Sequence, residues 1–236
     1  MTNLLDIKRA MEKSAEALTE NTLKTVNNHG ELYAEMLHYL EMLNLWSNKL
    51  EVYDSNIVLQ EVCYDLLSSL YIAAQGMYRN AYICLRSALE LGMSFIYFID
   101  RNYEYLLWKE NDYDMKWSTL KDNEKGLLSK KYFSLFLGKE SNQIDHLIEQ
   151  FKSVYRECSE YVHGKYKYMH TIEEQKIHYQ ENKIEFWSVM FIDITKLLNI
   201  LFTIRFNEYA NSFSDDKKIS LKEMLTDYQL GGLIQI

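Results

Sequence analysis

The sequence contains no proline, and glycine occurs only eight times in 236 residues. At average usage, about one residue in twenty is a proline. Proline breaks helix interiors and marks loops, so a chain without it favours long helices joined by few tight turns. No segment sustains the alternation of apolar and polar residues that is typical of a strand. The sequence therefore predicts an all-α protein.

Cysteine is also scarce, and its spacing excludes the usual cysteine-based sites. The three cysteines, Cys63, Cys84 and Cys158, lie far apart and form no CxxC pair. This argues against a disulfide framework or a zinc site and indicates buried thiols in a reducing compartment. The first thirty residues carry charges throughout and lack the apolar core of a signal peptide. We therefore expect a cytoplasmic protein.

Long uncharged apolar runs are missing as well. The two most apolar stretches, residues 81–99 and 186–204, are interrupted by charged side chains. A membrane-spanning helix needs about 18 or more consecutive apolar residues with few or no charges. We therefore expect both stretches to be buried core helices and expect no membrane partner.

The common nucleotide and hydrolase motifs are absent too. The chain has no GxxxxGK[ST], GxGxxG, HExxH or GxSxG sequence, which removes the most frequent enzyme classes. Its formal net charge of −8 argues against broad, sequence-blind binding of nucleic acids, although it leaves room for a local basic groove. The apolar fraction of 47% is that of a globular protein.

What the sequence does contain is apolar residues at helical spacing. This spacing predicts long helices over residues 2–27, 31–53, 57–75, 78–100, 143–163 and 182–212. Residues 101–142 mix charges, aromatics and turn signals, which indicates an insertion or excursion of short helices. Residues 164–181 are a polar connection, and 214–236 form a C-terminal tail. The simplest account is one domain over 1–236, a bundle of four to five long helices plus short ones.

Arg156 and His163 are the strongest candidates for chemistry. Seven residues return to nearly the same helix face, at a rise of about 10 Å. Gly164 is suited to ending the helix, so His163 would lie where the helix dipole favours an imidazolium. Histidine can move the proton of a 2′-hydroxyl or of a leaving oxygen, and arginine can stabilise charge on a phosphate. Alternatively, Arg156 pairs with Glu160 and both residues only stabilise the helix.

The flanking residues are suited to RNA. Lys165 and Lys167 can contact phosphates, and Tyr166 can stack on a base. Arg86 and Glu90, four residues apart on a predicted helix, are expected to pair with each other, either to fix packing or to support the cleft.

A different enzyme class is also open. Glu35-x-x-His38 and Glu160-x-x-His163 are two ExxH pairs on separate predicted helices. Di-iron carboxylate bundles use two such pairs together with two single glutamates. His163 would project from a helix end rather than from mid-helix, so we expect no metal and no other cofactor.

The segment YRECSEYVHG, residues 155–164, resembles the signature of the HEPN superfamily. That signature is an arginine, four to six residues, and a histidine near a helix end. The helix over 78–100 is similar to the HEPN helix with an "A..LLR..LE" pattern, whose counterparts here are Ala81, Leu85, Arg86, Leu89 and Glu90.

The resemblance implies a helical ribonuclease that dimerises so that two Arg/His pairs face one cleft. In it, Arg156 and His163 are the catalytic pair, and Glu157 holds the polar position after the arginine. Many members are toxins of toxin–antitoxin systems or antiviral defence effectors, and some are non-catalytic modules that bind RNA or protein. The implied partners are RNA, a second copy of the chain, and a neutralising or sensor protein.

Overall fold

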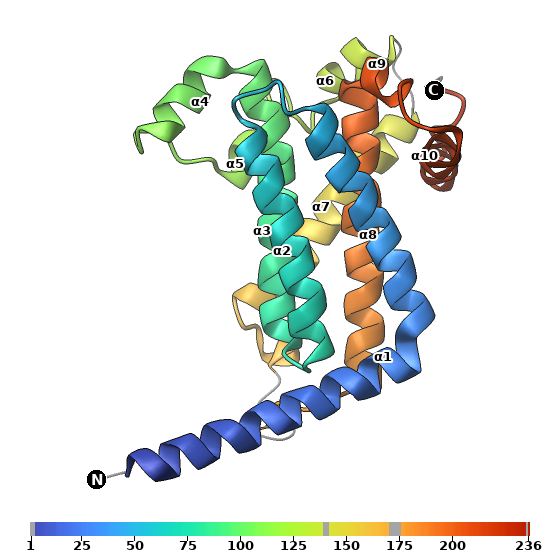
Figure 1. Ribbon diagram of the computed structural model, residues 1–236. Coiled ribbons are helices and arrows are strands. Elements are labelled where there is room, and N and C mark those ends of the chain that lie inside the picture. Colours follow the sequence, from blue (N-terminus) through green and yellow to red (C-terminus); the bar gives the residue numbers. More distant parts are fainter. Residues whose placement is uncertain (1–2, 139–141, 170–175, 235) are drawn as a thin grey trace.

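The computed structural model describes residues 3–138, 142–169, 176–234 and 236, and within these ranges every regular element is a helix. The predicted all-α class is therefore confirmed. Four helices run side by side with the second half of a fifth to form an elongated bundle (Figure 1). The five long helices are α1 (Leu4–Lys49), α2 (Asn56–Ala74), α3 (Tyr78–Asp100), α7 (Asn142–Val162) and α8 (Glu181–Arg205).

Helix α1 is bent where the sequence predicts a break between two helices. His29 has non-helical backbone angles, φ −130° and ψ 27°, and the chain resumes helical geometry at once without a loop. The second half of α1 belongs to the bundle. The first half crosses the end of the bundle and projects beyond it (Figure 1).

The core lies between α8 and its neighbours and is rich in aromatic rings. Phe202 of α8 is fully buried and meets Trp46 of α1 and Phe95 of α3 edge-on, with ring centroids 6.2 and 5.9 Å apart. Trp187 of α8 donates its indole N–H to the Ser69 hydroxyl of α2 at 3.1 Å. That hydroxyl donates to the carbonyl of Ala81 at 2.9 Å, so one buried chain of hydrogen bonds joins three helices.

Short helices fill both the central excursion and the C-terminal part. Within 101–138 they are α4 (Asn102–Lys109), α5 (Trp117–Leu120) and α6 (Lys130–Leu137), and after α8 come α9 (Asn207–Ala210) and α10 (Asp215–Asp227). The predicted single helix over 182–212 is wrong at its end. Phe206 leaves helical geometry at φ −123° and buries its ring beside Phe95.

The cysteines are free thiols, but only Cys158 is fully buried. Cys63 and Cys84 are half-buried, so the expectation of three buried thiols is only partly met. Burial raises the pKa of Cys63 to about 11, which keeps this thiol protonated and unreactive at neutral pH.

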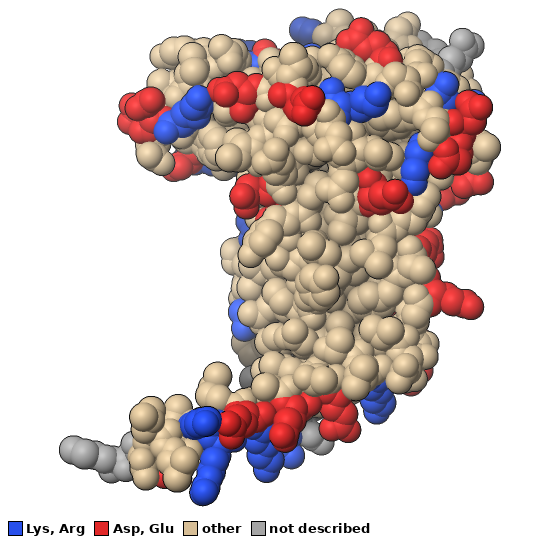
Figure 2. Space-filling view, viewed as in Figure 1, with Lys and Arg blue, Asp and Glu red and all other residues tan. Residues whose placement is uncertain are grey.

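Three helices, α2, α3 and α8, are long and apolar enough to cross a membrane by length and composition alone. Most of the apolar window is buried inside the bundle in α3 (61%) and α8 (72%), against 44% in α2. Helix α2 exposes Tyr64 and Tyr71 on a broad, largely uncharged face (Figure 2). The absence of membrane spans and the cytoplasmic location therefore stay predictions.

Phe202 and Phe186 provide a matched test of the core, since both are phenylalanines of α8. Phe202 is fully buried, whereas Phe186 is 66% exposed. We expect Phe202→Ala to lower the free energy of unfolding by about 3–5 kcal/mol, because it leaves a cavity between three helices. Phe186→Ala should change it by less than about 0.5 kcal/mol. Urea unfolding followed by circular dichroism measures both, and equal losses would contradict the assigned core.

Candidate functional site

Arg156 and His163 lie on the side of the α7 helix that faces away from the bundle. The opposite side is buried at helical spacing through Phe151, Val154, Cys158 and Tyr161. Both candidate side chains are exposed, and neither makes a hydrogen bond or an ion pair with another described residue. The alternative pairing of Arg156 with Glu160 is thus not formed within the described chain. The two side chains are available to a ligand.

The end of α7 is closed by a Schellman motif, as the glycine predicts. Gly164 has φ +61°, the Lys165 N–H donates to the Glu160 carbonyl at 3.3 Å, and the Gly164 N–H donates to the Tyr161 carbonyl at 3.2 Å. His163 is therefore the C-cap residue, placed one position beyond the last helical residue, Val162.

Arg79 is a further residue at this helix end, and the sequence analysis missed it. From the first turn of α3, its guanidinium donates to the carbonyls of Tyr161 (3.1 Å) and Val162 (3.2 Å). A positive charge thus already lies at the negative end of the α7 dipole. Nothing in the local sequence around Arg79 signals a contact 82 residues away.

Arg86 and Glu90 form the predicted ion pair, with 3.3 Å between Nη2 and Oε1. The same Arg86 nitrogen donates to the hydroxyl of Tyr155 at 2.8 Å, which ties α3 to α7 next to Arg156. The Tyr155 ring stacks on Trp117, with centroids 3.7 Å apart and planes at 3°. Burial, and secondarily the Glu90 carboxylate, raise the pKa of Tyr155, so the phenol stays neutral. The ion pair is therefore part of the packing of α3 on α7 beside Arg156. Its support of a cleft stays a prediction.

Glu157 also has a structural partner, because it accepts a hydrogen bond from the Tyr168 hydroxyl at 3.2 Å. Tyr168 ends the short 3-10 helix η1 (Tyr166–Tyr168) that follows α7, and its ring packs on Tyr161 with centroids 4.5 Å apart. Burial raises the pKa of Tyr168, and the two neighbouring glutamates act in the same direction. Glu157 thus holds η1 against the end of α7.

The three predicted RNA contacts differ in their surroundings. Lys165 forms an ion pair with Glu160 at 2.6 Å, so its charge is partly compensated. Tyr166 is 78% exposed and its ring is open to stacking. The side chain of Lys167 lies outside the described part of the structure.

The two ExxH pairs do not form a metal site in the described chain. The His38 Nε2 atom lies 3.0 Å from the Ser220 hydroxyl, and Glu35 accepts a hydrogen bond from the Tyr39 hydroxyl at 3.3 Å. Across the described ranges, no three His, Cys, Asp or Glu side chains come together as metal ligands. The di-iron alternative therefore lacks a ligand set there.

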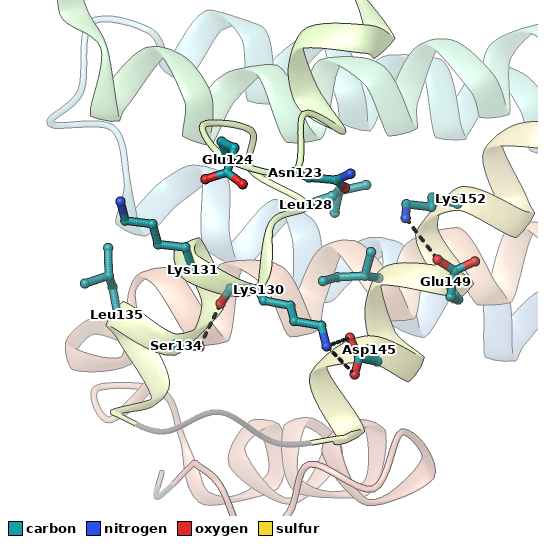
Figure 3. Close-up of a pocket in the computed structure, with 11 residues that line it drawn as sticks. Asn123, Glu124, Leu128, Lys130, Lys131, Ser134, Leu135, Asp145, Glu149 and Lys152 are labelled. Atoms are coloured by element: carbon teal, nitrogen blue, oxygen red, sulfur yellow. Dashed lines mark hydrogen bonds and ion pairs between the residues drawn. The ribbon is translucent and has the colours of Figure 1, made fainter.

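A pocket of about 620 Å³ opens beside the first half of α7, between α6 and the loop before it (Figure 3). Its rim carries Lys130, which pairs with Asp145 at 2.8 Å, and Lys152, which pairs with Glu149 at 2.9 Å. Lys131 also lines it and makes no ion pair with a described residue. Lys152 is four residues before Arg156, so the exposed side of α7 runs from this pocket towards His163.

The chain matches no family model, and no curated protein or solved structure matches it either. The resemblance to the HEPN superfamily rests on the sequence patterns alone and stays a prediction.

Alanine substitutions at Gly164, which has a positive φ, and at Gly30, which is helical, test the end of α7. Gly164 has φ +61°, and an added Cβ would lie 3.2 Å from the Arg79 guanidinium, whereas Gly30 lies in helix α1 with nothing within 4 Å. We expect Gly164→Ala to destabilise the fold by about 1–2 kcal/mol, because left-handed geometry strains a residue with a side chain. Gly30→Ala should stabilise it by about 0.4–1 kcal/mol. Thermal unfolding shows whether each variant is less or more stable than the wild type. A Gly164→Ala protein as stable as the wild type would contradict the assigned helix end.

Proposed function

We propose that this protein is a metal-independent endoribonuclease of HEPN type that acts in the cytoplasm as a toxin or a defence effector. The proposal rests on the exposure of the Arg156 and His163 side chains and on their lack of partners in the described chain. Both side chains are exposed on one side of a helix that is firmly anchored to α3, yet neither is used by the described fold. A helix that is fixed to its neighbour is a more precise support for a functional site than a loop.

The proposed reaction uses only groups of the protein and the RNA. His163 takes the proton of a 2′-hydroxyl as its oxygen attacks the neighbouring phosphorus. The bond from phosphorus to the 5′-oxygen breaks, which gives a 2′,3′-cyclic phosphate and a 5′-hydroxyl after the leaving oxygen is protonated. Arg156 stabilises the negative charge that develops on the phosphate.

The spacing of the pair supports a homodimer. The backbones of Arg156 and His163 are separated by a rise of about 10 Å, and one imidazole cannot serve both the attacking and the leaving oxygen at once. A second copy of the chain facing the first would supply the second histidine and the second arginine. RNA would be held by Lys165, Tyr166 and Lys167, and further along α7 by Lys152. A neutralising or sensor protein would control such an activity.

The exposure of the pair also favours a second candidate function. Arg156 and His163 lie on an open helix side in the single chain, a setting that fits a non-catalytic module for RNA or protein. Such a module would bind RNA with strong salt dependence but without turnover.

Incubation with mixed tRNA and single-stranded RNA in EDTA tests the proposal. We expect the wild type to cleave RNA but not the 2′-deoxy analogue, and we expect 2′,3′-cyclic phosphate ends. Arg156→Ala and His163→Ala should each lower the cleavage rate by at least about 100-fold, the usual range for a lost acid–base or charge-stabilising group.

His146→Ala is the matched control, because His146 is another exposed histidine of α7 and has no role in the proposed site. It should cleave like the wild type. No cleavage by the wild type, together with salt-dependent RNA binding, would favour the non-catalytic module. Unchanged cleavage by His163→Ala would refute the assigned site.

A further inference from the structure

The first half of α1 forms an arm, residues 4–20, that projects from the bundle and is almost entirely exposed (Figure 1). Its base is fixed by hydrogen bonds to the bundle end. The side chain of Asn21 donates to the Gln75 carbonyl at 3.0 Å, and the hydroxyl of Thr25 donates to the Ala74 carbonyl at 3.0 Å. The Tyr179 N–H donates to Asn21 at 3.2 Å. These contacts set the direction of the arm.

The side of α1 that docks on the bundle continues outward along the arm as a largely apolar stripe. The docked positions include Asn21 and Thr25, and helical spacing extends the same side back towards the N-terminus. The stripe consists of Leu4, Ile7, Lys8, Met11, Ser14, Ala15 and Leu18. Leu4 is 80% exposed and Met11 67%, so a face built for packing has no partner in the single described chain.

We propose that this stripe binds the same stripe of a second copy, with the two arms antiparallel and their two-fold axis at Met11. In this register Leu4 faces the partner's Leu18, Ile7 faces the partner's Ala15, and Met11 faces the partner's Met11. The polar positions match as well, because Lys8 faces the partner's Ser14. Apolar positions of the stripe therefore meet apolar positions and polar positions meet polar ones, as a self-complementary two-fold interface requires.

The charges beside the stripe agree with this arrangement. Lys8 and Glu12 lie at the same edge of the arm, 3.8 Å apart within one chain. Antiparallel pairing brings equivalent edges together, so Lys8 approaches the partner's Glu12, and the reverse, about 3 Å apart along the axis. The pairing also uses the whole free stripe, since the partner's tip ends opposite Leu18, just before the first docked residue, Asn21.

Charge balance favours a protein partner over an anionic lipid surface. Residues 3–28 carry four acidic and four basic side chains, and both signs are visible along the arm (Figure 2). An amphipathic helix that binds anionic membranes carries an excess of lysine and arginine on its polar face. The arm has no such excess.

Molar mass in solution, measured by light scattering across a dilution series, tests the pairing. We expect the wild type to reach twice 28.2 kDa and Met11→Glu to stay at 28.2 kDa, because two glutamates would meet on the axis. Leu23→Glu is the matched control: Leu23 is 59% exposed on the same helix but lies off the stripe and beyond the partner's tip. Leu23→Glu should dimerise like the wild type. Circular dichroism should show the same helix content for the wild type, Met11→Glu and Leu23→Glu.

Cysteine pairs test the direction of the arms. Met11→Cys should form an intermolecular disulfide under mild oxidation, because its copies meet on the axis. Leu4→Cys alone should form none, whereas a mixture of Leu4→Cys and Leu18→Cys proteins should crosslink. Crosslinking by Leu4→Cys alone would mean parallel arms.

Three further outcomes would overturn the proposal. These are a monomeric wild type, a Met11→Glu protein that still dimerises, and a flotation assay in which vesicles of anionic lipid bind the wild type but not Met11→Glu. None of these measurements involves RNA. A dimer that survives Met11→Glu would refute the arm pairing but not the homodimer of the ribonuclease proposal, whereas a monomeric wild type would contradict both.

Discussion

The burial of α8 is the constraint on which the other helices depend. This helix is apolar on nearly every side, and its last half is almost entirely buried. One partner cannot cover such a helix, so α1, α2, α3 and α7 all pack around it. Helix α7 is held in turn by α3, which places the exposed side of α7 and its two candidate residues on a fixed support.

Helices α3 and α7 each carry a pair of side chains with the same spacing but with different surroundings. Arg79 and Arg86 are seven residues apart on α3, the spacing that separates Arg156 and His163 on α7. The α3 pair is occupied by backbone carbonyls, a carboxylate and a phenol, whereas the α7 pair has no described partner. Spacing places side chains on one face of a helix, but the neighbouring helix decides whether they are used for packing or left free.

The extent to which the structure follows from the sequence varies with the range of the interaction. The helical class, the break near His29 and the turn at Gly164 depend on local preferences, and the sequence predicts them. The ion pair of Arg86 and Glu90 is local too. The cap formed by Arg79 depends on which helices are neighbours, and so does the end of α8 at Phe206. Neither leaves a local signal, because tertiary packing overrides the helical pattern there.

The bend at His29 divides α1 into two parts of unequal stability. The second half is covered by the core, whereas the arm before it is held mainly by polar contacts at its base, including the 2.8 Å contact between His29 and the Tyr179 hydroxyl. Segments with few buried contacts open at far lower free energy than the core. In the isolated chain, amide hydrogens of the arm should therefore exchange with solvent through local fraying, long before those of the same helix beyond the bend. A single helix would thus report two separate free energies of opening.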